Sequence, residues 1–163
     1  MLTEELVVQT GEVDQAVWIM REVAGWCAAT DKNMWQLDEL TPAALQNGIT
    51  AQNFCVGWLS GEPAATMILQ WTDPVFWPEI NADQSGFIHK LCVRRQFAGK
   101  GLSRQMVEFA IGECRKRGIH YLRLDTGWQR LKLRNLYEKL GFVCKGRKVV
   151  AGKEYALYEM QID

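Results

Sequence analysis

The chain has 163 residues, 48% of them hydrophobic and 23% charged, which is the composition of a globular protein and not of a disordered one. Its 19 Lys and Arg residues balance 19 Asp and Glu residues, and this zero net charge argues against a generic nucleic-acid binder. The length suits one domain with a substantial core, so we expect a single domain over residues 1–163.

The sequence carries no sign of export, of membrane insertion or of a metal centre. No apolar run approaches the roughly 20 residues of a membrane span, and residues 1–10 do not resemble a signal peptide, so we expect a soluble, cytoplasmic protein that binds no membrane. The five cysteines lack C-x-x-C spacing, which predicts reduced core thiols, with a nucleophilic role for Cys92 left open. Two scattered histidines and no close cysteine pair predict no metal site.

The first part of the chain predicts a strand, two helices and a hairpin. Residues 5–9 form the first expected strand, and apolar residues at helical spacing over 13–27 predict a helix. A second helix begins after Thr41, a suitable N-cap residue, and stops at Gly48. Two strands then flank a tight turn at 60–62.

The second part begins with a loop at 71–85, which holds two prolines and residues of mixed polarity. Residues 86–93 are largely apolar on both faces, which is typical of a central, buried strand. The elements expected after it are a helix at 101–117, a strand at 120–126, a helix at 130–140 and two closing strands at 142–149 and 154–162. The order β-α-α-β-β-β-α-β-α-β-β predicts an α/β domain with a mixed sheet.

The segment RRQFAGKGLSRQ, residues 94–105, joins a strand to a helix through two glycines. The first N–H groups of a helix lack intrahelical partners and the helix dipole adds positive charge there, so such a junction favours a phosphate. Gly99 and Gly101 let the backbone come close to a ligand, because they have no Cβ and tolerate unusual φ/ψ angles. Further positive charge comes from Arg94, Arg95, Lys100 and Arg104.

The glycine spacing matches neither of two common phosphate-binding loops. Gln96-x-x-Gly99-x-Gly101 is not followed by the G-K-[ST] of a Walker A loop, and it is not the G-x-G-x-x-G of a dinucleotide fold. A glycine turn with solvated basic side chains therefore stands beside the anion-binding interpretation.

Two motifs resemble those of the GNAT superfamily of acyl-CoA-dependent N-acyltransferases. QFAGKG, residues 96–101, is similar to the family's Q/R-x-x-G-x-G/A motif, which follows the fourth strand and opens the next helix. LYEKLGF, residues 136–142, is similar to the motif on the helix after the fifth strand. The resemblance covers about residues 86–145. It implies a single-domain GNAT fold with a mixed, mostly antiparallel central sheet flanked by helices, and acetyl-CoA as the acyl donor.

The resemblance implies roles for particular positions. Main-chain N–H groups over 97–103 would hold the pyrophosphate of coenzyme A, and the backbone of 91–93 would pair with its pantetheine amides as an added strand does. The strands at 86–93 and 120–125 would splay apart to admit that arm. The phenol of Tyr137 would protonate the departing thiolate. The implied coenzyme A site comprises Leu91, Cys92, Val93, Gln96, Phe97, Ala98, Gly99, Lys100, Gly101, Leu102, Ser103, Arg104, Arg130 and Tyr137.

Two of these positions have other interpretations. Arg130 stands where the family often has an Asn that touches the pantetheine arm, and Arg cannot accept a hydrogen bond, so it could instead meet a phosphate. Tyr137 lies on an apolar stripe with Leu133 and Leu140, where a tyrosine usually packs in the core.

A base must take a proton from an ammonium substrate before the amine attacks a thioester. His89 is the first candidate, although an interior hydrogen-bonded histidine is an equal interpretation. Asp125, at the end of its strand, is the second, and it could instead brace the following loop. Glu79 and Asp83 are weaker candidates, since loop carboxylates are usually solvated.

The 71–85 loop is the expected place of substrate contact. Its aromatic residues stand beside carboxylates such as Asp73, a combination that suits a cationic amine, although single tryptophans are more often buried in a core. The predicted substrate residues are Trp71, Trp77, Glu79 and Trp128.

Together these features predict an N-acetyltransferase that moves an acetyl group from acetyl-CoA to a primary amine of a small molecule, by direct attack in a ternary complex. A peptide or protein acceptor stays open. A non-catalytic acyl-CoA sensor and a different phosphate binder, such as a nucleotide-binding protein, are also compatible with the motifs. No nucleic-acid partner is expected, and a homodimer is compatible with the sequence.

Overall fold

The computed structural model describes residues 4–29, 35–46 and 48–163. The helices and strands are β1 (Val7–Thr10), α1 (Val13–Ala29), α2 (Pro42–Leu45), β2 (Phe54–Leu59), β3 (Glu62–Gln70), β4 (Gly86–Val93), α3 (Leu102–Lys116), β5 (Tyr121–Gly127), α4 (Leu131–Lys139), β6 (Val143–Val150) and β7 (Lys153–Gln161). This sequence of elements confirms the predicted β-α-α-β-β-β-α-β-α-β-β order. Short 3-10 turns at Leu37–Glu39, Ala51–Asn53 and Arg95–Phe97 were not predicted.

The seven strands form one sheet in the order β1-β2-β3-β4-β5-β7-β6. β4 and β5 run parallel, whereas β1 with β2, β2 with β3, β5 with β7 and β6 with β7 run antiparallel. The fold is therefore α/β with a mixed, mostly antiparallel sheet, as expected. No described helix is both long enough and apolar enough to span a membrane.

The chain divides into two compact units. The first comprises Met1–Ile68 and Lys90–Phe109, and the second comprises Leu69–His89 and Ala110–Asp163. The division falls within β3, β4 and α3, so these three elements contribute residues to both units. The extent of the single domain stays a prediction.

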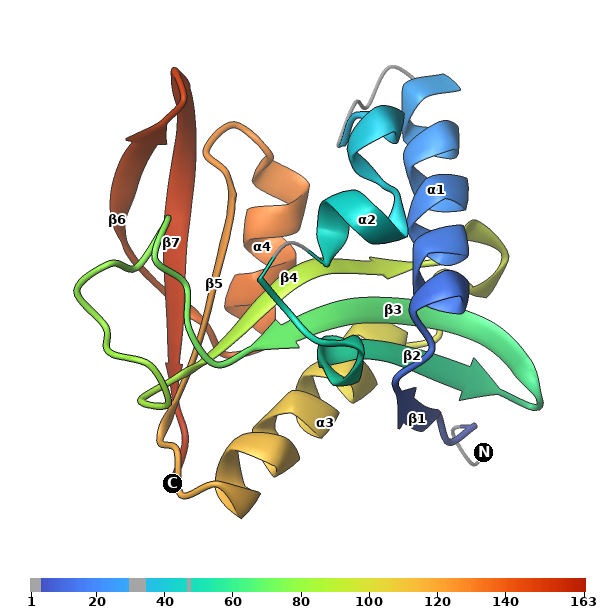
Figure 1. Cartoon of the computed structure of the whole chain (residues 1–163), viewed down its shortest axis with the longest axis horizontal. Helices are drawn as coiled ribbons and strands as arrows, with labels where there is room; N and C mark the ends of the chain where they lie inside the picture. The colour runs from blue at the N-terminus through green and yellow to red at the C-terminus, as the bar shows by residue number, and fades with distance from the viewer. Residues whose placement is uncertain (1–3, 30–34, 47) are drawn as a thin grey trace. The chain divides into compact units, whose positions relative to one another are not determined.

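The first unit packs α1 and α2 over strand β2 (Figure 1). Helix α2 begins where its cap predicts, since the Thr41 side chain accepts the N–H of Ala44 at 3.2 Å. It ends at Leu45, before the expected stop at Gly48. The core of this unit contains Ala16, Ile19, Met20, Ala24, Leu40, Phe54, Val56, Ile68 and Cys92.

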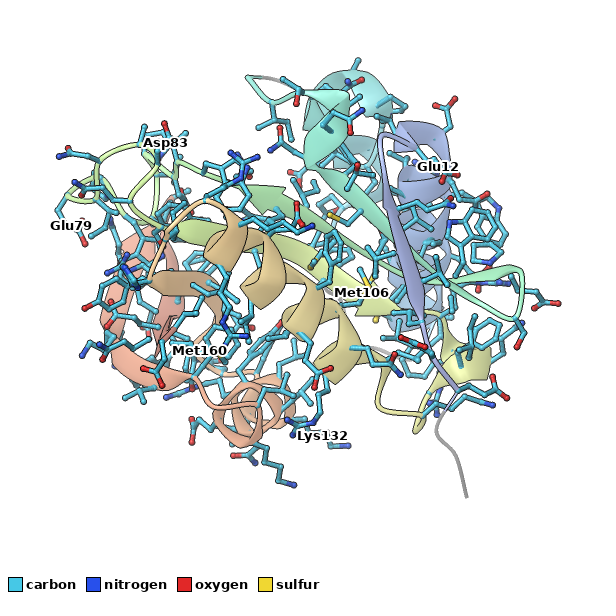
Figure 2. The ribbon with its side chains drawn as sticks, turned by 90° about the horizontal axis from the view of Figure 1, so that it is seen from below. Glu12, Glu79, Asp83, Met106, Lys132 and Met160 are labelled. Atoms are coloured by element: carbon cyan, nitrogen blue, oxygen red, sulfur yellow. The ribbon has the colours of Figure 1, made fainter. Side chains whose placement is uncertain are left out.

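Strand β2 packs closely against side chains of the first unit at Gly57. A Cβ built on Gly57 would lie 2.6 Å from Cδ2 of Leu6 and 2.9 Å from Sδ of Met106, the α3 residue labelled in Figure 2, so a larger residue at position 57 would require these side chains to move. Met106 is fully buried, and it lies on the stripe that the helical spacing predicted.

The second unit contains strands β5, β7 and β6 with helix α4, and strands β6 and β7 form the C-terminal hairpin (Figure 1). Tyr158 of β7 is fully buried, and its ring lies 6.2 Å from that of Tyr137 on α4. Ala151 and Gly152 both have positive φ, 51° and 78°, as a two-residue hairpin turn requires. The first half of β4 pairs in parallel with β5, and this pairing positions the candidate site.

Candidate active site

His89 and Asp125 lie side by side because β4 and β5 pair in parallel register. The ladder runs from Gly86↔Leu122 to Ile88↔Leu124, and the next residues on the two strands are His89 and Asp125. Nδ1 of His89 lies 3.8 Å from Oδ1 of Asp125, which is longer than a hydrogen bond. The two predicted base candidates therefore belong to one site in the second unit. Both side chains stay partly accessible, His89 at 22% and Asp125 at 12%.

A third side chain, Asp73, completes this cluster from the loop between β3 and β4. Its Oδ2 lies 3.1 Å from Nε2 of His89 as an ion-pair contact, and this oxygen makes no well-aligned hydrogen bond among the described residues. Its Oδ1 accepts the backbone N–H groups of Val75 and Phe76, at 3.2 and 3.0 Å. From the sequence, Asp73 was expected only as one carboxylate of the loop, and its pairing with His89 was missed. The Asp-Pro dipeptide at 73–74 was the one available signal, since it favours a turn.

The environment of Asp73 favours its charged form. The side chain is only 5% exposed, and burial alone raises the pKa of a carboxyl. The hydrogen bond and charge of His89 and the two backbone N–H donors outweigh that burial and leave the pKa of Asp73 lowered. The site thus holds a carboxylate fixed against Nε2 of the imidazole.

The loop that carries Asp73 is tied to the sheet at several points, all within the second unit. Asp83 donates its backbone N–H to the Trp71 carbonyl at 2.8 Å, which closes the two ends of the loop. Nζ of Lys148, on β6, donates to the carbonyls of Val75 and Phe76 at 3.2 and 3.1 Å. The Phe76 ring also meets Tyr155 of β7 edge-on, with centroids 4.9 Å apart.

The three polar side chains also meet the first requirement of a metal site. Asp73, His89 and Asp125 each offer a ligand atom, and these atoms lie within 4.8 Å of one another. The expectation of no metal had considered only histidines and cysteines and had overlooked this set. However, the Asp73 carboxylate lies nearest Nε2 of His89, whereas the Asp125 carboxylate lies nearest Nδ1. A single ion binds only one nitrogen of an imidazole ring, so this arrangement does not favour one shared metal ion.

The three predicted substrate tryptophans already stack with arginines of the second unit. The guanidinium of Arg117 lies 4.0 Å from the ring centre of Trp71, and that of Arg123 lies 5.4 Å from Trp77. The ring faces that carry these groups are closed to a ligand. Trp128 is approached by two guanidinium groups, those of Arg134 at 4.1 Å and Arg147 at 5.0 Å. Substrate contact by these residues stays a prediction.

The two remaining loop carboxylates, Glu79 and Asp83, are exposed, and they project from the loop into solvent in Figure 2. Neither has an ion pair among the described residues, in contrast to Asp73. The structure therefore selects Asp73 from the three carboxylates of this loop.

Tyr137 lies on α4 and is buried, with 7% of its surface exposed. Its ring meets Phe142 at 6.0 Å and Tyr158 at 6.2 Å between centroids. The ring is thus part of the core, as the apolar stripe suggested, and a role for its hydroxyl as the general acid stays a prediction. Arg130 precedes α4, with its side chain against Gly127, where an added Cβ would lie 3.2 Å from Arg130 Cγ.

The glycine-rich segment belongs to the first unit and has the backbone that its glycines predict. Gly99 and Gly101 have φ of 80° and 73°, in the left-handed region, and a Cβ built on either would meet no atom within 4 Å. The first helical bond of α3 runs from the N–H of Gln105 to the carbonyl of Gly101. The N–H groups of residues 102–104 precede that bond and are therefore the amides that a helix start offers to an anion.

Three expected contributors to the anion site have other partners. The backbone N–H groups of Phe97 and Ala98 donate to the carbonyls of Arg94 and Arg95, at 2.9 and 3.1 Å, within a 3-10 turn. Arg94 also pairs with Glu22 at 3.0 Å and stacks on Trp18 at 4.6 Å. The predicted amides of 97 and 98 and the charge of Arg94 are thus already used within the protein.

The strand before this segment contains a strained residue. Lys90 has φ of 57°, which is rare for a non-glycine residue, and it directly precedes the predicted pantetheine contacts at 91–93. A left-handed residue inside a strand is typical of a bulge, which bends the strand. Burial raises the pKa of the Cys92 thiol well above its usual range, with a smaller effect of Cys27, which argues against a nucleophilic Cys92.

A hollow of about 370 Å³ lies at the other end of β5, and His89, Asp125 and Tyr137 do not line it. It is lined by Ile80, Asp83, Gln84, Gly118, Ile119, His120, Tyr121 and Arg123. The ring Nδ1 of His120 lies 3.4 Å from the Ile162 carbonyl, which suits a structural role for this histidine.

Comparisons with known proteins agree with this architecture. Residues 19–142 match the acetyltransferase (GNAT) family. The uncharacterized N-acetyltransferase YesJ of Bacillus subtilis strain 168 is 29% identical over 98 residues, which cover 57% of this chain and 49% of YesJ. The chain therefore spans about half the length of the curated relative that it matches.

Solved structures show the same fold at low sequence identity. A GNAT-family acetyltransferase of Streptococcus agalactiae aligns with a TM-score of 0.77 and 18% identity, over 100% of this chain and 99% of that one. One from Listeria monocytogenes aligns at 0.76 and 21% identity, over 98% and 96%. A Bacillus anthracis protein solved in complex with acetyl coenzyme A aligns at 0.57 and 15% identity, over 68% and 62%. The chain described here, with its paired strands and glycine-rich helix start, belongs to the acetyltransferase (GNAT) family, a class of acyltransferases.

Proposed function

We propose that this protein transfers the acetyl group of acetyl-CoA to a primary amine, and that the acceptor is a small molecule. The observation that carries the proposal is the imidazole of His89 between the carboxylates of Asp73 and Asp125, in a member of an acetyltransferase family. An imidazole can take a proton from an ammonium group near neutral pH, and carboxylates attract that cation.

The glycine-rich segment supports acetyl-CoA as the donor. The left-handed glycines 99 and 101 and the helix-start amides at 102–104 suit the pyrophosphate of coenzyme A. Lys100 and Arg104 add charge, while the backbone of 91–93 is proposed to bind the pantetheine arm. The complex of acetyl coenzyme A with the structurally similar B. anthracis protein is consistent with this donor.

The proposed reaction uses residues of the chain for orientation and proton transfer. His89 takes one proton from the bound ammonium, and the neutral amine then forms a bond to the thioester carbonyl carbon. Backbone N–H groups of the central strand stabilise the oxyanion, and the C–S bond breaks as the phenol of Tyr137 protonates the thiolate. The new amide gives its second proton to the phenolate through water, and His89 returns its proton to solvent. One proton is released in total.

A non-catalytic acyl-CoA sensor is the second candidate, because Arg130 replaces the asparagine common in the family. Tyr137→Phe separates the two functions. An enzyme loses on the order of 10²-fold or more in kcat but keeps its affinity for acetyl-CoA, whereas a sensor shows no turnover to lose.

Calorimetric titration with acetyl-CoA, with ATP and NAD as controls, tests the donor. Micromolar binding of acetyl-CoA alone, followed by thiol release in a screen of small amines and short peptides, supports the proposal. Equal binding of ATP indicates a nucleotide-binding protein. Tight donor binding without turnover on any amine favours the sensor.

A further inference from the structure

We propose that Asp73 is a positioning residue: its carboxylate holds the Nε2–H of His89, so that Nδ1 is the nitrogen that takes the proton from an amine bound between Nδ1 and Asp125. This inference rests on the proposed function. It assigns a role to one carboxylate of the loop between β3 and β4, and it distinguishes the two ring nitrogens.

The first step is that Asp73 is fixed before it meets His89. Its Oδ1 is held by the N–H groups of Val75 and Phe76, and its carbonyl accepts the N–H of Trp77 at 3.0 Å. A carboxylate held in this way can use only its second oxygen, Oδ2, for the imidazole. That oxygen lies 3.1 Å from Nε2, within hydrogen-bond distance.

The second step concerns the tautomer of His89. A carboxylate accepts hydrogen bonds and donates none, so the oxygen beside Nε2 requires a proton on that nitrogen. Neutral imidazole carries one proton, so Nδ1 then holds the lone pair. The contact with Asp73 therefore decides which nitrogen acts as the base.

The third step is the gap on the opposite side of the ring. Nδ1 and Asp125 Oδ1 are 3.8 Å apart, too far for a direct hydrogen bond. An ammonium nitrogen can lie between them at about 2.8 Å from both Nδ1 and Oδ1, a usual distance for a charge-assisted hydrogen bond. Asp125 then attracts the cation, while Nδ1 takes its proton. The same face of β5 also carries Arg123, but Glu159 neutralises it at 2.7 Å.

The chain makes this inference directly testable, because it contains only two histidines. In a His120→Gln background, long-range ¹H–¹⁵N spectra report His89 alone. At a pH where the ¹⁵N shifts show a neutral ring, we expect the proton on Nε2 in the otherwise unchanged protein. In Asp73→Asn the tautomer ratio should shift several-fold toward Nδ1–H, because the amide N–H₂ of Asn can donate to Nε2.

Kinetics provide the second measurement. Asp73→Asn should lower kcat at least as much as the tautomer ratio shifts, and by no more than the about 10²–10⁴-fold that a general base contributes in total, with little change in the amine KM. Asp125→Asn should mainly raise the amine KM and leave the tautomer unchanged. Asp38→Asn is the control, since Asp38 is an exposed carboxylate and is not one of the proposed site residues. It should keep both kcat and the tautomer.

The outcomes separate this inference from the proposed function. A proton on Nδ1 in the parent protein overturns the role of Asp73, whether or not the variants fold. An unchanged tautomer in Asp73→Asn overturns it equally. If no amine is acetylated, the proposed function fails, while the spectra still decide whether Asp73 orients the ring.

Discussion

Tyr158 of β7 donates a hydrogen bond of 2.6 Å from its phenol to the carboxylate of Glu138 on α4. Arg134, one turn earlier on the same helix, donates its Nε–H to the phenol oxygen at 2.9 Å. Burial, together with the bond to Glu138, raises the pKa of Tyr158, and Arg134 opposes that shift. These two bonds tie α4 to the sheet on either side of Tyr137, so they fix the helix that carries the proposed general acid.

Tyr158→Phe tests this attachment. The substitution removes both hydrogen bonds but keeps the buried ring, and Glu138 and Arg134 can regain water. We expect a loss of about 1 kcal/mol in the free energy of unfolding, or roughly 2–4 °C in Tm. Thermal unfolding followed by circular dichroism measures it. Glu138→Gln, which keeps an acceptor oxygen, should cost less, and an unchanged Tm in Tyr158→Phe would show that the two bonds add nothing.

The lowered pKa of Asp73 predicts a specific dependence of stability on pH. A carboxyl whose pKa is lower in the folded than in the unfolded protein stabilises the fold above its ordinary pKa of about 3.8, and this stabilisation is lost as pH falls through the folded value. Asp73→Asn should therefore be less stable than the parent by about 1–3 kcal/mol at pH 7. The difference should shrink as the pH is lowered below ~4. Urea unfolding at a series of pH values measures it, and a constant difference would contradict the expected ionisation.

The glycines of the anion site provide a test of donor binding. Replacing Gly99 and Gly101 by alanine puts a side chain at positive φ, at a cost of about 1 kcal/mol each, and adds methyl groups where we expect the pyrophosphate. We expect a folded double variant whose Kd for acetyl-CoA rises at least tenfold in calorimetry. Gly112→Ala, in α3 and without a positive φ, is the control and should leave the affinity unchanged. A double variant that folds and binds acetyl-CoA normally would contradict the proposal that this segment binds the pyrophosphate.

Chelation tests whether the Asp73–His89–Asp125 cluster requires a metal ion. Because the two nearest carboxylate oxygens face different nitrogens of the ring, we expect dialysis against EDTA to leave kcat within about twofold. We expect added zinc to inhibit, because it competes with the proton for an imidazole nitrogen. A loss of activity on chelation that zinc restores would instead assign these side chains as metal ligands.

Periodicity in the sequence was sufficient to predict the helices and strands. The apolar pattern of 86–93 and the short segment 120–126 predicted the two strands that carry His89 and Asp125. The spacing of Gly99 and Gly101 predicted a backbone that only glycine adopts easily, and both have positive φ. These features depend on local geometry, which a sequence expresses directly.

The features that were missed depend on contacts between segments without a regular pattern. Asp73 lies in a loop of irregular polarity, so no spacing related it to His89. The arginine partners of Trp71 and Trp128 come from other elements, and the stacking was therefore not predicted. The 3-10 turn that uses the amides of Phe97 and Ala98 is too short to leave a periodic signal.

The hydrogen bond between Trp71 and Asp83 has a consequence for engineering. Because it joins the two ends of the loop at 2.8 Å, exposed residues of the intervening segment can be varied without breaking this closure. A variant that keeps Trp71, Asp73 and Asp83 preserves the closure and the partner of His89. We therefore expect variation at the exposed residues between them to change acceptor preference separately from proton transfer.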